Sequence, residues 1–235
     1  MTGGGTAAGA AIEVVCLDMA GTTVSDGGAV MEAFRAGLAA GGIDEGHPRL
    51  DDALTYARDT MGQSKIEVFR AVLGQEDAAQ AGLAGFERRW DEFLAAGRVT
   101  ALPGAEEAIG RLRGAGVRVA LLTGFSRSVR DAVVAALAWQ DLADLYVCPE
   151  EAGRGRPWPD MVLWSALRLA APSMAAVAAA GDTPSDVESA RRAGAGVAAG
   201  VLTGTGTAEE LWGAGATHVL ASVSDLAELV LGGRD

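Results

Sequence analysis

Apolar and polar positions change their spacing along this chain. Residues 12–18 form a short apolar run that ends in a carboxylate, which is the pattern of a buried strand. Residues 25–100 instead show apolar positions at helical spacing, and we find no convincing strand among them. Helices are predicted there at residues 30–39, 50–61 and 65–73, and over a long stretch that ends near residue 96. This block is therefore predicted to be a helical insertion.

From residue 101 onward, short apolar runs alternate with amphipathic segments. Such alternation is typical of a parallel sheet with helices on both faces and right-handed crossovers. The sequence thus predicts an α/β fold with a Rossmann-like, doubly wound core at 11–24 and 101–235, an inserted helical cap domain at 25–100 and a flexible N-terminal tail at 1–10. The predicted strands span 117–123, 145–148, 175–180, 197–202 and 218–220, and the predicted helices span 103–113, 126–138, 159–170, 184–193, 208–213 and 223–231.

Composition narrows the class of protein. Hydrophobic residues make up 49% of the chain and charged residues 21%, which suffices for a sizeable core. Acidic residues outnumber basic ones 31 to 19, so we expect neither a nucleic-acid nor a membrane partner. Two cysteines, Cys16 and Cys148, are too few for a disulfide framework or a cysteine zinc site. With no signal-peptide pattern and no apolar run as long as a membrane span, a soluble cytoplasmic protein is expected.

Polar side chains stand where several predicted strands end. Asp18, Thr123 and Asp182 each close a strand, and Arg154 and Arg156 follow another. In an open parallel sheet, ligands bind beyond the carboxyl ends of the strands, so two carboxylates, a hydroxyl and a guanidinium are expected on one rim. Neighbouring carboxylates can share a Mg²⁺ ion, while Arg and Thr donors suit phosphate oxygens. Any one of them alone would more often be a strand-end cap, but together they favour a site.

The basic residues are 18 arginines and one lysine, Lys65. Of the two side chains, only the amine of lysine is readily deprotonated for covalent chemistry. Taken alone, however, a bias in composition that left one lysine by chance is the better explanation.

Four segments follow one another along the chain: Asp18-Met-Ala-Gly-Thr-Thr, Leu122-Thr-Gly, Arg156-Pro-Trp-Pro and Gly181-Asp-Thr-Pro-Ser-Asp186. Together they resemble the motifs of the haloacid dehalogenase superfamily, in the same order and with a helical cap inserted after the first. This resemblance implies Mg²⁺-dependent phosphoryl transfer through an aspartyl-phosphate.

The resemblance also implies roles for single residues. Asp18 would be the nucleophile, and Asp18, Asp182 and the backbone carbonyl of Ala20 would bind the metal, supported by Asp186. Thr123 would donate a hydrogen bond to a phosphoryl oxygen, and Arg156 would neutralise charge. The residues expected to line the substrate site are Ala20, Gly21, Met61, Gly62 and Gly124.

Ala20 narrows the resemblance to one branch. Phosphatases of the superfamily usually carry an aspartic acid there, which protonates the departing alkoxide. Alanine cannot donate a proton, and at this position it is similar to the phosphonoacetaldehyde hydrolase (phosphonatase) branch, which cleaves a carbon–phosphorus bond through an imine on a cap lysine. Met61-Gly-Gln-Ser-Lys65 resembles the lysine segment of that branch. The resemblance therefore implies that Lys65 is a catalytic Schiff-base lysine acting on phosphonoacetaldehyde or a close analogue.

Three residues depart from that branch: Val68 replaces a histidine, Phe125 a tyrosine, and Asp160 is typical of phosphatases. A phosphatase for a small phosphate ester therefore stays open as an alternative. A catalytically silent binding protein is a third, which the intact motifs disfavour. The resemblance further suggests a cap-mediated homodimer, while the exact substrate and pathway stay open.

Other features are assigned structural roles. Phe86, Trp90 and Phe93 have the helical spacing of a cap core. Residues 204–207 are predicted to be a strand-to-helix turn capped by Thr207, with Glu210 at capping-box spacing. The histidines His47 and His218 are also predicted to be structural.

Overall fold

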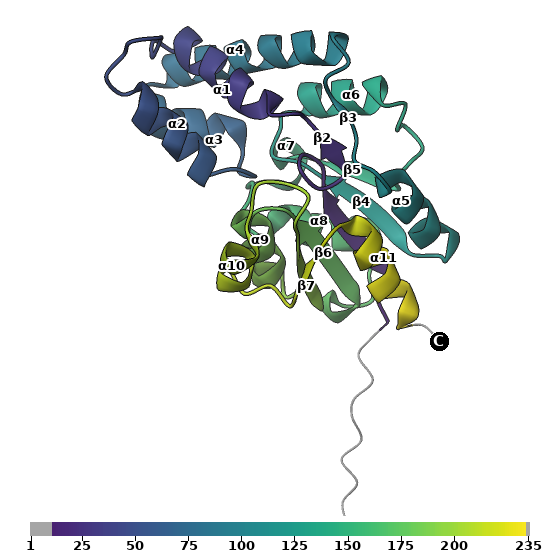
Figure 1. Ribbon diagram of the computed structural model, residues 1–235. Coiled ribbons are helices and arrows are strands. Elements are labelled where there is room, and N and C mark those ends of the chain that lie inside the picture. The colour runs from purple at the N-terminus through teal and green to yellow at the C-terminus, as the bar shows by residue number, and fades with distance from the viewer. Residues whose placement is uncertain (1–10, 234–235) are drawn as a thin grey trace, which may run out of the picture.

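The computed structural model describes residues 11–233, and the tail predicted at residues 1–10 lies outside them. A six-stranded, fully parallel sheet with the order β5-β4-β1-β6-β7-β8 forms the centre of the molecule (Figure 1). This arrangement confirms the predicted doubly wound α/β fold. The strands are β1 (Val14–Asp18), β4 (Arg118–Leu122), β5 (Leu145–Val147), β6 (Val177–Gly181), β7 (Val197–Val201) and β8 (His218–Leu220).

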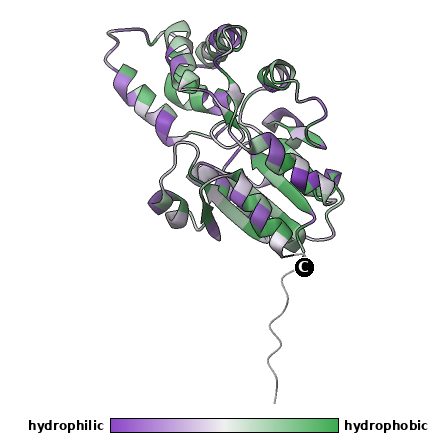
Figure 2. Ribbon diagram, turned by 45° about the vertical axis from the view of Figure 1, so that its right-hand side comes forward, coloured by the Kyte–Doolittle hydropathy of each residue, from purple (hydrophilic) through white to green (hydrophobic). Residues whose placement is uncertain are grey.

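Helices cover both faces of this sheet because successive strand residues point to opposite sides. In β1, Val15 and Leu17 belong to the core that includes α5 and α11, whereas Val14 and Cys16 pack with α8 and α9. Figure 2 shows the strands as green, hydrophobic ribbons between helices banded green and purple. The helices are α5 (Ala105–Gly114), α6 (Arg127–Ala136), α7 (Pro149–Ala152), α8 (Asp160–Arg168), α9 (Pro184–Ala193), α10 (Ala208–Gly213) and α11 (Val223–Gly232), and a 3₁₀ turn spans Met174–Ala176.

The four helices predicted in the insertion form a separate layer above the sheet (Figure 1). Their shared core is aromatic: the Phe34 ring lies 5.3 Å from Phe69 and 5.2 Å from Phe86. Phe86, Trp90 and Phe93 are all buried, as predicted. These cap helices are α1 (Ala29–Ala40), α2 (Leu50–Asp59), α3 (Lys65–Leu73) and α4 (Glu76–Ala95).

Two short strands at the base of the cap correct the sequence interpretation. β2 (Val24–Ser25) and β3 (Thr100–Ala101) pair antiparallel where the chain enters and leaves the cap. We expected no strand between residues 25 and 100, and this was wrong at both ends. Two-residue strands carry no periodicity, and their pairing joins segments about 75 residues apart in the sequence, so the local pattern could not reveal it.

None of the helices within residues 11–233 is long and apolar enough to span a lipid bilayer.

Candidate active site

One cavity of about 320 Å³ lies where the sheet meets the cap. Asp18 ends β1, and Thr123 and Asp182 directly follow β4 and β6, so three strands deliver polar side chains to it. Arg156, from the loop between α7 and α8, reaches the same space. The predicted convergence on one rim is therefore present, and every residue expected to line the substrate site also borders this cavity: Ala20, Gly21, Met61, Gly62 and Gly124.

Three buried carboxylates cluster at the core end of the cavity, and two of them, Asp18 and Asp182, line it. Oxygens of Asp18, Asp182 and Asp186 lie within 4.8 Å of one another. Arg156 bridges two of them, with Nη2 2.8 Å from Asp18 Oδ1 and Nε 2.5 Å from Asp186 Oδ1. Burial raises the pKa of Asp18 well above its usual range despite the opposing effect of Arg156. Burial and the Asp186 carboxylate likewise raise the pKa of Asp182 to about 6.

The charge balance of this cluster fits a divalent cation. One guanidinium faces three carboxylates in a dry environment, and uncompensated buried charge is costly. Carboxylate and carbonyl oxygens are the ligands that Mg²⁺ prefers. Asp18, Asp182 and the Ala20 carbonyl could therefore hold the ion, with Asp186 beside them.

The loop after β1 folds tightly over Asp182. Met19 accepts backbone hydrogen bonds from Thr22, Thr23 and Val24, which turns the chain directly after the strand. Gly21 has φ +85°, and a Cβ there would lie 2.6 Å from Asp182 Oδ2. Only glycine can therefore let the loop approach the carboxylate this closely.

The loop after β7 adds donors that sequence reasoning missed. Thr205 donates to Asp182 Oδ2 from its backbone nitrogen at 2.8 Å and from its hydroxyl at 3.2 Å. Thr203 donates its hydroxyl to the Gly21 carbonyl at 2.7 Å. Thr207 and Glu210 do form the predicted capping box, but the turn has this second role. The available signal was strand order: β7 neighbours β6, so the loop after it lies beside Asp182.

The cap rests on the loop after β4 through residues 62–65. The Lys65 backbone nitrogen donates to the Gly124 carbonyl at 3.2 Å, and Arg156 donates to the Gly62 carbonyl at 3.2 Å. A side chain at Gly124 would collide with the Gln63 carbonyl, so the glycine permits this close contact. Lys65, the first residue of α3, is thereby brought to the wall of the cavity.

The Lys65 ammonium lies in largely aromatic surroundings. The residue is only 5% exposed, and Nζ lies 5.2 Å from the centre of the Phe125 ring and 5.4 Å from that of Phe34. Within residues 11–233, no carboxylate forms an ion pair with it. Burial lowers the pKa of Lys65 to about 8, although Asp18 and Asp26 act in the opposite direction. A substantial fraction of this amine is therefore neutral near physiological pH.

The departures noted in the sequence have defined places. Val68, one turn beyond Lys65 in α3, is buried in the apolar core of the cap. Asp160 binds Arg154 through a 2.8 Å ion pair, and neither residue lines the 320 Å³ cavity. Of the two arginines in this loop, Arg156 therefore supplies the guanidinium expected on the rim, while Asp160 holds that of Arg154 outside the cavity. The histidines His47 and His218 also lie outside the cavity.

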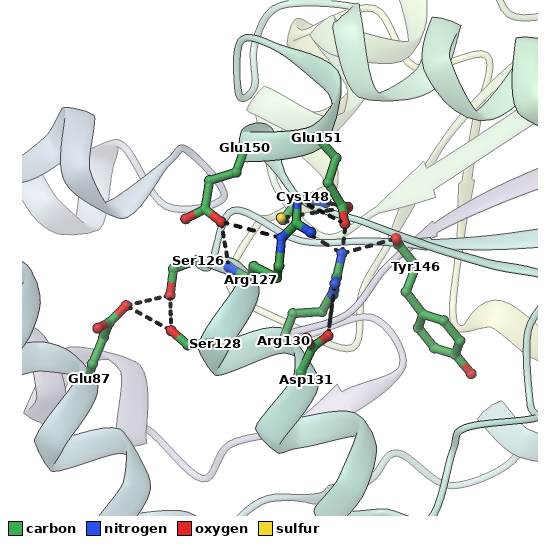
Figure 3. Close-up of polar contacts among 10 residues, drawn as sticks. All are labelled: Glu87, Ser126, Arg127, Ser128, Arg130, Asp131, Tyr146, Cys148, Glu150 and Glu151. Carbon is green, nitrogen blue, oxygen red and sulfur yellow. Dashed lines mark hydrogen bonds and ion pairs between the residues drawn. The ribbon is translucent and has the colours of Figure 1, made fainter.

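Polar contacts fix the loop that carries Gly124 and Phe125. Figure 3 shows the hydroxyls of Ser126 and Ser128 donating to Glu87 of the cap helix α4. It also shows the buried Arg130 of α6 paired with Glu151, at 2.5 Å. The first contact joins the loop to the cap, and the second anchors α6 to α7 in the core.

Comparisons with known proteins agree with this geometry. The family model for haloacid dehalogenase-like hydrolase matches residues 12–194. A phosphonoacetaldehyde hydrolase from Pseudomonas fluorescens (strain SBW25) is 30% identical over 200 residues, covering 78% of this chain and 70% of that protein. Protein CbbY from Rhodobacter capsulatus is 31% identical over 189 residues, covering 78% and 82%.

The solved structure of a phosphonoacetaldehyde hydrolase-like protein from Oleispira antarctica superposes with a TM-score of 0.73 at 25% identity, covering 99% of this chain and 96% of that one. Because the family model spans most of the chain and the sheet, cap and carboxylate cluster are all present, this protein belongs to the haloacid dehalogenase-like hydrolase family.

Proposed function

We propose that this hydrolase cleaves the carbon–phosphorus bond of phosphonoacetaldehyde or a close analogue, with a Schiff base on Lys65 and an aspartyl-phosphate on Asp18. The observation that carries the proposal is the placement of the chain's single lysine. Lys65 is buried, has a lowered pKa and lines the same cavity as Asp18. The names of the relatives from P. fluorescens and O. antarctica support the same chemistry.

The core side of the cavity would perform phosphoryl transfer. The Asp18 carboxylate attacks phosphorus, while Arg156 and Thr123 donate hydrogen bonds to phosphoryl oxygens. Asp18, Asp182 and the Ala20 carbonyl would hold Mg²⁺, with Asp186 in support. When bound, this ion supplies positive charge that offsets the carboxylates and the phosphoryl group.

The cap side would make the carbon leave. The neutral Lys65 amine attacks the aldehyde, and loss of water with uptake of one proton from solvent gives a protonated imine. As Asp18 forms its bond to phosphorus, the electron pair of the carbon–phosphorus bond moves to carbon and neutralises the iminium, giving an enamine. Protonation and hydrolysis of the enamine release acetaldehyde, and water releases phosphate from Asp18. This route needs no acid for an alkoxide, which agrees with Ala20.

The second candidate is a phosphatase for a small phosphate ester. Three residues favour it: Asp160 is typical of phosphatases, and Val68 and Phe125 replace polar residues of the phosphonatase branch. Ala20 disfavours it, because a departing alkoxide would lack a proton donor at that position.

Trapping the imine separates the two candidates. The protein is incubated with phosphonoacetaldehyde and Mg²⁺, reduced with borohydride and examined by mass spectrometry for an adduct on Lys65, while acetaldehyde and phosphate release are followed in wild type and Lys65→Arg. Arginine retains the charge but cannot form the imine. We expect an adduct in wild type and no turnover in the variant. The absence of an adduct, together with a Lys65→Arg variant that still hydrolyses phosphate esters, would establish the phosphatase instead.

A further inference from the structure

An imine mechanism needs a group that moves a proton to and from carbon, and no histidine lines this cavity. The branch that the sequence resembles has a histidine in place of Val68, and this valine is aliphatic and 2% exposed. Five titratable side chains line the cavity: Asp18, Asp26, Lys65, Arg156 and Asp182. Four of these have roles in the proposed function. Asp26 is the one that remains.

Asp26 is held rigidly in the loop between β2 and α1. Its Oδ1 accepts the Gly28 N–H at 3.1 Å and its Oδ2 accepts the Val30 N–H at 3.0 Å. These bonds satisfy free backbone donors at the start of α1 and fix the carboxyl group. Among the ion pairs of residues 11–233, none includes Asp26, and the residue is partly exposed, so water can reach its carboxyl group.

Asp26 and Lys65 line the same cavity. The Asp26 charge stabilises the Lys65 ammonium, as does that of Asp18. Helix α1 connects the two sites, because Asp26 caps its first turn and Phe34 of the same helix contacts Lys65 Nζ. The Asp26 charge also acts on Arg98, which is already bound to Glu32 at 2.6 Å.

We propose that Asp26 is the general acid–base of the Lys65 chemistry, a proposal that rests on the proposed function. The Asp26 carboxyl proton moves to the enamine carbon, whose double-bond electron pair forms the new C–H bond. The nitrogen lone pair forms C=N⁺, and the Asp26 carboxylate remains. Water then adds to the imine and gives up a proton to that carboxylate, which restores the acid as the carbon–nitrogen bond breaks.

The reverse of this step gives an assay that is independent of phosphorus. Incubated with acetaldehyde in D₂O, the wild-type protein should exchange the methyl hydrogens for deuterium through the imine and enamine, which NMR follows directly. Lys65→Arg should abolish this exchange. Asp26→Asn should slow it by about 10²–10⁴-fold, the usual contribution of a general acid–base.

Controls separate proton transfer from folding. Asparagine is a good helix cap but keeps only one of the two acceptor oxygens of Asp26, so Asp26→Asn should fold with a slightly lower melting temperature, and exchange is measured well below it. Asp26→Glu retains the carboxyl group and should recover part of the rate. Asp225→Asn is the matched control, because Asp225 also accepts a backbone N–H at a helix start, at 3.0 Å from Ser222, but does not line the cavity.

The outcomes distinguish the two proposals. Exchange at the wild-type rate in Asp26→Asn, with loss in Lys65→Arg, would overturn the role of Asp26 and leave the proposed function intact. The absence of both methyl exchange and a borohydride adduct in the wild-type protein would overturn both proposals.

Discussion

The two ends of the cavity are built on opposite electrostatic principles. At the core end, Asp18, Asp186 and Arg156 form a connected set of ion pairs, and Asp182 accepts hydrogen bonds from Thr205. At the cap end, the Lys65 ammonium lies between aromatic rings without an ion-pair partner among the described residues. The core end is suited to hold a charged phosphoryl group, whereas the cap end is suited to keep an amine neutral.

This contrast matches what the proposed function requires of each half. Phosphoryl transfer is favoured by fixed charges and donors that require no rearrangement as the reaction proceeds. Attack on a carbonyl by an amine requires loss of a proton, and an apolar environment favours this loss. The four predictions below test whether the halves are separable, in order of decreasing expected effect.

The largest effect is expected from Asp18→Asn, which removes the proposed nucleophile from the core half of the cavity and leaves the cap half unchanged. The amide has the same shape but is not a nucleophile, so phosphate release should fall by on the order of 10⁴-fold or more. Methyl exchange of acetaldehyde should persist, because it uses Lys65 and not Asp18. Phosphate assays and NMR measure the two activities, and loss of both would show that the halves cannot be separated.

The pH dependence of Lys65 reactivity tests the cap half. Because the pKa of Lys65 is about 8, the neutral fraction should rise roughly 50-fold between pH 6 and pH 8 and level off above. The rate of acetylation by dilute acetic anhydride, quantified at this residue by mass spectrometry, reports that fraction. A transition centred near the ordinary value of 10.5 would contradict the apolar environment.

Replacing Lys65 by methionine tests how much folding stability is lost by burying the Lys65 ammonium in the cap half of the cavity. The unfolded chain holds this proton up to about pH 10.5 and the folded one only to about 8, so wild-type stability should increase with pH across this window. At pH 7, Lys65→Met should therefore raise the free energy of unfolding by up to about 3 kcal/mol. Urea unfolding at pH 7 and pH 10 gives the free energy of unfolding of both proteins. If Lys65→Met exceeds wild type by the same amount at both pH values, the lowered pKa of Lys65 is not the cause.

Addition of Mg²⁺ tests the core half without any reaction. At 100 times its dissociation constant the ion should stabilise the fold by about 2.7 kcal/mol, which raises the melting temperature by roughly 5–11 °C. Asp182→Asn should remove most of this response. Asp160→Asn should keep it in full, because Asp160 pairs with Arg154 outside the cavity. An equal response in all three proteins would place the ion elsewhere.

Much of the fold could be predicted because its signals are local. The helices at Lys65–Leu73, Pro184–Ala193 and Ala208–Gly213 have the predicted boundaries, since apolar periodicity and capping residues act over a few positions. The rim residues Asp18 and Thr123 could be placed because parallel strands present their carboxyl ends at one edge.

Other parts of the site depend on contacts between distant segments. Thr205 reaches Asp182 only because β7 pairs with β6, and Arg156 rather than Arg154 supplies the guanidinium of the rim because Asp160 binds Arg154. Asp26 had no sequence signal beyond its loop position. Its place in the cavity depends on how α1 and the β2–β3 pair join the cap to the core.

The sequence by itself determined the element types, the α/β class and the motif residues at the strand ends, because periodicity, capping and strand direction are properties of neighbouring residues. Only the tertiary structure decided that Lys65 is buried among aromatic rings and shares a cavity with Asp18 and Asp26. The physical reason is that burial and electrostatic environment arise where distant segments pack together, and these set the pKa of a side chain.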